Sequence, residues 1–188
     1  PPPPVFFHAD AGIREPLWSR GRGDGYKRQA EALTSFRSQV QSWLSEHFPA
    51  SLKANAAGIM ESAFSENELS SDAEQWRQDL AEAGYGAPTW PREYGGAGLS
   101  DRDAAVLSSE MAKVGAFNPI PGLAGMGVTM VGPTVLEYGT EEQKLRHLPG
   151  IASGQVRWCL GLSEPNAGSD LASLTTKAQD DGDSCLLY

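Results

Sequence analysis

Cysteine is scarce in this sequence of 188 residues, and its two cysteines, Cys159 and Cys185, form no CxxC pair. Thiolate metal sites need such clusters, and the histidines His8, His47 and His147 are scattered without metal-ligand spacing. We therefore expect no metal centre. A reduced, cytoplasmic chain is the simplest interpretation of so few cysteines.

Clustered positive charge and long apolar runs are also missing. Lys and Arg number 15 against 24 Asp and Glu, which gives a net charge of -9 and argues against binding to nucleic acid. No uncharged apolar run is long enough to span a membrane, and the start, PPPPVFFHADAG, lacks the basic region of a signal peptide. With 40% hydrophobic and 21% charged residues, the composition is typical of a globular protein.

The first part of the chain predicts helices after an irregular start. Residues 1–25 are rich in Pro, Gly and Arg, and we expect an irregular or disordered lead-in there. From Tyr26, apolar residues recur at three- and four-residue steps, which predicts a helix that Pro49 ends. A second helix is expected near Ser71, which has capping-box spacing to Glu74.

The segment 84–100 holds two prolines and five glycines, which are typical of a loop. Its Tyr85, Trp90 and Tyr94 favour an ordered loop, because aromatic residues at this density usually pack into a core. Ser100 is then predicted to cap the next helix. The apolar stripe of that helix is Leu107, Met111 and Val114.

Residues 121–138 are apolar on nearly every side, which predicts a buried helix with a kink or break at Pro133. Thr140 and Gln143 have capping-box spacing and predict a short helix, EEQKLRHL. Together these patterns indicate a helical domain over residues 26–153.

The pattern changes after residue 153. Residues 155–162 alternate in part and suggest a strand, and residues 174–179 and 184–188 suggest two more around the turn DDGD. We therefore predict an α+β fold, in which residues 154–188 begin a β domain.

The loop GLSEPNAGSDLAS, residues 161–173, follows the first of these strands. Its turn residues, the hydroxyls of Ser163 and Ser169 and its backbone N–H groups could hold a polar ring edge or a phosphate. Glu164 and Asp170 are expected to brace the loop. An ordinary β-turn loop with an exposed acid pair explains the same residues, so spacing alone leaves both interpretations open.

This loop resembles the signature of the acyl-CoA dehydrogenase family at every constrained position. Three further segments resemble the family in its order: residues 80–100 (LAEAGYGAPTWPREYGGAGLS), residues 137–154 (EYGTEEQKLRHLPGIASG) and the DGD turn at 181–183. The resemblance covers residues 26–188. It implies a helical N-terminal domain followed by a β-barrel-like middle domain, of which this chain holds the beginning.

The resemblance also implies FAD as cofactor. Leu160, Leu162 and Ser163 would border the flavin ring, with a hydrogen bond from Ser163 to the ring edge. Gly168 and Ser169 would approach the ribityl or phosphate part of the cofactor, and Ser169 would also approach the acyl-CoA substrate.

The implied reaction is α,β-dehydrogenation of an acyl-CoA thioester, with an electron-transfer flavoprotein or similar acceptor and a homo- or hetero-oligomer as partners. No residue matches the family's carboxylate base, which we expect beyond Tyr188, so the chain alone is expected to bind FAD poorly and to be inactive. Alternatives are a flavin oxidase or monooxygenase of the same fold, a non-catalytic subunit of a mixed oligomer, and a prematurely ended gene product.

Overall fold

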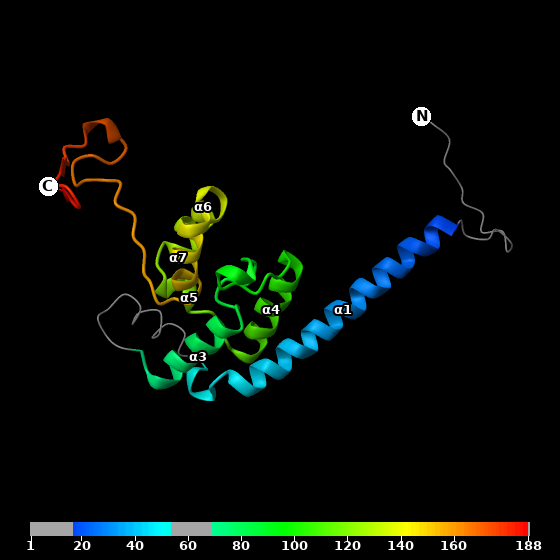
Figure 1. Ribbon diagram of the computed structural model, residues 1–188. Helices are drawn as coiled ribbons and strands as arrows, with labels where there is room; N and C mark the ends of the chain where they lie inside the picture. The colour runs from blue at the N-terminus through cyan, green and yellow to red at the C-terminus, as the bar shows by residue number, and fades with distance from the viewer. Residues whose placement is uncertain (1–16, 54–68, 188) are drawn as a thin grey trace, which may run out of the picture.

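The computed structural model describes residues 17–53 and 69–187, with side chains from residue 31 onward (Figure 1). Its helices are α1 (Leu17–His47), α3 (Ser71–Glu82), α4 (Asp101–Val114), α5 (Ile120–Leu123), α6 (Gly132–Tyr138) and α7 (Glu141–Ala152). Single turns are η1 (Ala50–Leu52), η2 (Arg92–Tyr94), η3 (Gly127–Val131) and η4 (Leu171–Ser173), and the strands are β1 (Ala178–Asp180) and β2 (Cys185–Leu187). The α+β class is confirmed, and no helix within the described ranges is long and apolar enough to cross a membrane.

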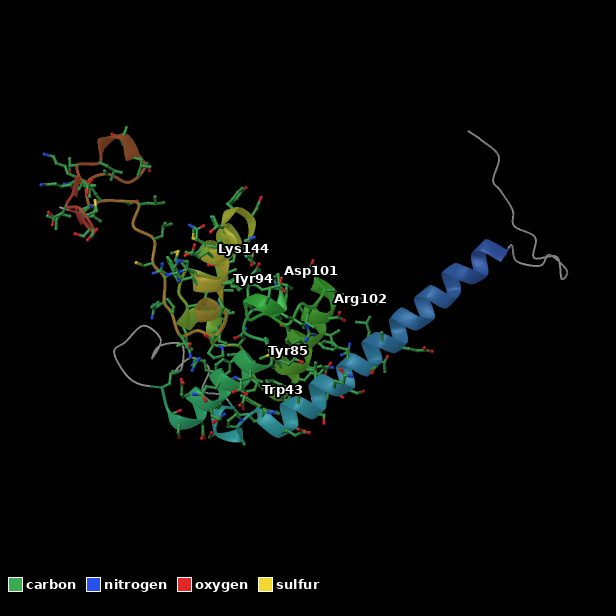
Figure 2. The ribbon with its side chains drawn as sticks, in the orientation of Figure 1. Trp43, Tyr85, Tyr94, Asp101, Arg102 and Lys144 are labelled. Carbon is green, nitrogen blue, oxygen red and sulfur yellow. The ribbon has the colours of Figure 1, made fainter. Side chains whose placement is uncertain are left out.

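One part of the core lies where α1, α3 and α4 meet. Trp76 is fully buried there, and its indole N–H donates to the carbonyl of Phe117 at 2.8 Å. Trp43 packs beside it, at 5.3 Å between ring centroids, and meets Tyr85 edge to face at 5.0 Å (Figure 2). Trp76 and Leu80 of α3 are buried. The predicted apolar stripe of α4 is confirmed as buried for Leu107 and Met111, but Val114 is 38% exposed.

A second part of the core joins the 84–100 loop to α7. Trp90 and Tyr94 are buried and pack with Leu148 and Ile151, so the predicted packing of the loop aromatics is confirmed. The hydroxyl of Tyr94 donates to Glu141 at 2.6 Å. Figure 2 shows Tyr94 beside α7. Side-chain packing and the hydrogen bond to Glu141 therefore hold the loop against the helices.

A buried carboxylate ties α1 to α4. Glu110 is 2% exposed and accepts hydrogen bonds from Arg37, from Gln41 at 2.9 Å and from Lys113 at 2.7 Å. The hydrogen bond from Lys113 contributes most, followed by that from Gln41, to lowering the pKa of Glu110 to about 2. The ion pair therefore stabilises the fold above pH 4.5, the ordinary value, and this stability is lost as the pH falls through about 2.

Replacing Glu110 with glutamine is expected to lower the thermal midpoint at pH 7 by on the order of 5 °C, because Arg37 and Lys113 lose their anion. The difference from the parent chain should shrink between pH 4.5 and 2. Circular dichroism at several pH values measures both effects. A difference that stays constant down to pH 2 would contradict the assigned pKa.

Helix α1 begins earlier than predicted. It starts at Leu17 rather than near Tyr26, so the expected irregular segment 1–25 is helical in its last part. The prediction was wrong because Gly21, Gly23 and Gly25 weaken a helix by only about 1 kcal/mol each and do not end it as proline does. The earlier part of that segment lies outside the described residues.

The cap of α3 also differs by one residue. Ser70, not Ser71, is the N-cap, and its hydroxyl accepts from the amide of Ala73. Glu74 instead binds the buried Arg77, whose guanidinium also donates to the carbonyl of Ser153 at 2.5 Å. Gly84 follows the end of the helix with φ +71°, a backbone conformation that favours glycine. The predicted caps of Ser100 and of the Thr140–Gln143 capping box are confirmed.

Residues 121–138 do not form one buried helix. Helix α5 stops at Leu123, the π turn η3 follows, and α6 begins at Gly132 with Pro133 in its first turn. Gly125, with φ +60°, separates the pieces, because few other residues adopt that backbone conformation. Met126 and Met130 are 41% and 46% exposed, so the prediction of full burial was wrong. One side of this segment faces a groove.

The predicted strand over residues 155–162 is absent from the structure. It has one backbone bridge, Gly125 to Trp158, and otherwise no neighbouring strand to pair with in the described chain. The two later strands exist as an antiparallel hairpin, in which Ala178 faces Leu187 and Gly182 turns with φ +78°. The first of them is Ala178–Asp180, so the predicted start at residue 174 was wrong. Figure 1 shows this hairpin standing away from the helices. It follows an extended segment, residues 155–163, which we call the limb.

Candidate functional site

The broken helix and the extended limb are joined at one point. The amide of Met126 donates to the carbonyl of Trp158, and the amide of Trp158 donates to the carbonyl of Ala124, both at 3.0 Å. Gly125 lies between them, and a side chain there would meet the carbonyl of Trp158 at 2.6 Å. Glycine is thus required both by its backbone angle and by this close approach.

A groove of about 410 Å³ lies beside this joint and opens to solvent. Its walls are mainly apolar and come from α5, η3 and the start of the limb. The lining residues are Pro121, Gly122, Gly125, Met126, Thr129, Arg157, Trp158, Cys159 and Leu160. We call it the limb groove.

Trp158 anchors the floor of the limb groove. Its ring meets His147 edge to face at 5.6 Å and packs on the second part of the core. Its indole N–H is buried without a hydrogen-bond partner in the described structure. The ring therefore rests on protein.

The loop of residues 161–173, which we call the signature loop, contains a tight turn closed by backbone hydrogen bonds. Glu164 and Ala167 exchange two backbone hydrogen bonds of 3.1 Å, and the side chain of Ala167 is buried. The Glu164 carboxylate reaches across to accept from the amide of Thr176 at 2.6 Å and from the amide and hydroxyl of Thr175 at 3.0 Å. The pKa of Glu164 is lowered to about 2, first by the side chain of Thr176 and then by the backbone amides of Thr175 and Thr176. The predicted bracing role of Glu164 is thus observed.

The predicted cofactor residues lie along the limb and its turn. Leu160 borders the limb groove, and Leu162 follows it with 56% of its surface exposed. Ser163, Gly168 and Ser169 are exposed. No atom lies within 4 Å of a side chain built at Gly161 or Gly168, so a ligand can approach the backbone at both glycines.

Cys159 in this region is exposed, because the limb lacks a neighbouring strand to cover it. Among the described residues, no three His, Cys, Asp or Glu side chains gather as a metal site requires.

Sequence reasoning missed the groove residues Gly125, Met126, Thr129 and Arg157. The signal was present in GLAGMG, because repeated glycines inside an apolar run point to a helix break. The pairing of that break with Trp158 joins residues distant in sequence, and no local pattern reveals it.

Comparison with known proteins places these features in context. A family model described as "Acyl-CoA dehydrogenase, N-terminal domain" matches residues 31–155. Acyl-CoA dehydrogenase IpdE1 of Mycolicibacterium smegmatis is 38% identical over 155 residues, which are 80% of this chain and 37% of that protein.

Solved structures agree with this match. One called "Tcur3481-Tcur3483 steroid ACAD" is 35% identical with a TM-score of 0.55, and the match covers 84% of this chain and 38% of that one. The ChsE4–ChsE5 complex from Mycobacterium tuberculosis is 31% identical with a TM-score of 0.51, covering 83% and 36%. The chain therefore spans well under half the length of these relatives.

Proposed function

The chain belongs to the acyl-CoA dehydrogenase family, and on that premise we propose that it supplies the helical domain and flavin-contacting loop of an enzyme that oxidises an acyl-CoA thioester. The observation that carries the proposal is that the limb groove and a loop of exposed hydrogen-bond donors are neighbours along the chain. The limb contributes residues 157–160 to the groove, and the donors follow from Ser163.

The donor set fits the edge and phosphate parts of FAD. Ser163 and Ser169 offer hydroxyls, and Gly161 and Gly168 leave open space for backbone approach. Bound FAD would supply the two-electron acceptor, which takes a hydride from the β-carbon while a carboxylate base takes the α-proton. Fixed donors at the ring edge would stabilise the charge that develops there.

In this proposal the chain's own residues hold the acyl group and keep the signature loop in position. The limb groove would receive the acyl group, and the Glu164 carboxylate would keep the signature loop in one conformation through Thr175 and Thr176. We assign no base within residues 1–188. Three further features are proposed from the family resemblance. They are the carboxylate base, an electron-transfer flavoprotein or similar electron acceptor, and assembly into a homo- or hetero-oligomer.

A titration of the isotope-labelled chain with FAD tests the assignment. We expect amide shifts confined to residues 160–169, with weak affinity (a dissociation constant of about 10⁻⁴ M, or 5–6 kcal/mol) because one loop covers little of a large cofactor. The absorbance spectrum of the purified chain should show no stoichiometric flavin. If saturating FAD causes no amide shifts, the loop does not bind the cofactor. If the purified chain carries stoichiometric flavin, the expectation that it binds FAD only weakly by itself is wrong.

Replacing Ser163 with alanine should weaken FAD binding about fivefold to tenfold, since it removes one hydrogen bond. Replacing Ser184, in the hairpin turn, is the matched control and should leave affinity unchanged. Equal affinities for the Ser163 variant and the parent chain would remove Ser163 from the site.

A further inference from the structure

Met126 carries the longest side chain on the wall of the limb groove that residues 121–129 form. The other residues that this wall contributes to the lining are short or lack a side chain: Pro121, Gly122, Gly125 and Thr129. The backbone joint to the limb fixes how far apart the two walls stand. The space left for a ligand beside this wall is therefore set mainly by where the Met126 side chain lies.

The backbone of Met126 is fixed, but its side chain is not buried in the core. Its amide donates to the carbonyl of Trp158 at 3.0 Å, and its carbonyl accepts from the amides of Met130 at 3.0 Å and Val131 at 3.1 Å. Val128 and Val131 of the same turn pack against the core, whereas Met126 is 41% exposed. The side chain thus extends from a fixed point into the open groove.

The Met126 side chain is suited to changing the width of the groove. Methionine is unbranched and has three rotatable bonds, so it adapts to the shape of the group that it contacts. A straight acyl chain needs a narrow slot, whereas an acyl group that ends in a ring needs a wider one. A methionine beside two glycines can lie along the first and swing aside for the second.

We propose that Met126 is a specificity-determining residue, and that its movement lets the limb groove accept acyl groups that carry a ring as well as straight chains. This inference rests on the proposed function, because it takes the limb groove as the acyl site. It deepens that function by naming the substrate class and the residue that admits it.

Two CoA esters with the same number of carbon atoms test the inference: octanoyl-CoA, which is straight, and cyclohexylacetyl-CoA, which ends in a ring. Titrations of the isotope-labelled chain, followed at the amides of Gly122 and Gly125, give the affinity for each ester. The two affinities of the parent chain should agree within about threefold, because Met126 adjusts to both shapes.

Replacing Met126 with isoleucine keeps a side chain of similar size but makes it stiff at its first bond. This variant should bind the ring-bearing ester about fivefold more weakly relative to the straight one, which is about the effect of one methylene group. Replacing Met126 with alanine should shift the ratio in the opposite direction, since the straight chain then loses its contact with the wall.

Met130 is the matched control. It belongs to the same turn and is 46% exposed, but it does not line the groove. Replacing Met130 with isoleucine or with alanine should leave the ratio of the two affinities unchanged. The amide spectrum of each variant shows whether it remains folded.

A strong preference of the parent chain for either ester would overturn the inference, as would a ratio that stays unchanged in either Met126 variant. Equal effects of the substitutions at Met126 and Met130 would also overturn it. If neither ester shifts the groove signals, the groove is not an acyl site and the inference fails. FAD-induced shifts at residues 160–169 report on the proposed flavin loop separately, so the two failures are distinguishable.

Discussion

Replacing Gly132 with alanine is expected to lower the free energy of unfolding by about 3 kcal/mol. Gly132 is buried at the start of α6, and a methyl group there would overlap the six-membered ring of Trp90. Both residues belong to the packed junction between η3, α6 and the 84–100 loop, where neither can move freely. Urea unfolding followed by circular dichroism measures the loss.

The control for this substitution is Gly161 to alanine. No atom lies within 4 Å of a side chain built at Gly161, so its stability should stay within about 0.5 kcal/mol of the parent chain. Combining Gly132 to alanine with Trp90 to phenylalanine removes the overlapping ring atoms. The double variant should therefore lose less stability than the two single variants added together. Simple additivity would show that the ring is not the obstacle.

Replacing Glu164 with alanine is expected to release the signature loop. The amides of Thr175 and Thr176 lose their shared acceptor, and their hydrogen exchange should accelerate about tenfold or more, since the loop then opens locally. The affinity of the chain for FAD should also fall in this variant. Replacing Asp183, an exposed acid in the hairpin turn, with alanine should change neither measurement.

The same contact predicts a pH dependence. Because the pKa of Glu164 is lowered to about 2 from the ordinary 4.5, the carboxylate braces the loop fully above pH 4.5. The bracing is lost as the pH falls through about 2. Protection of the Thr175 and Thr176 amides, corrected for intrinsic exchange, should follow this window. Protection that is constant from pH 6 to 2 would show that Glu164 does not hold them.

Helix existence was predictable from sequence where periodicity and caps agree. Ser100 and Thr140 each accept from the backbone amide three residues later, and such a cap depends only on nearby residues. The buried faces of Trp76 and Leu107 follow from the same local repeat. Local rules also placed the hairpin turn at Gly182.

Features that depend on distant partners were not predictable. The segment 155–162 has the composition of a strand, but a strand forms only beside a partner strand. Within the described residues its one backbone bridge is that of Trp158 to Gly125. The same absence of cover exposes Cys159. The site residues Leu160 and Ser163 were named through family resemblance, whereas Arg157 became visible only when its approach to Gly125 was seen.

The joint between Gly125 and Trp158 attaches the start of the limb to the break between α5 and η3. The pair of backbone hydrogen bonds at Met126 and Trp158 fixes both the width of the groove and the direction in which the chain leaves toward Ser163. If a ligand in the groove raised the affinity of the loop for a second ligand by some factor, thermodynamic reciprocity would require the second ligand to raise the affinity of the groove by the same factor.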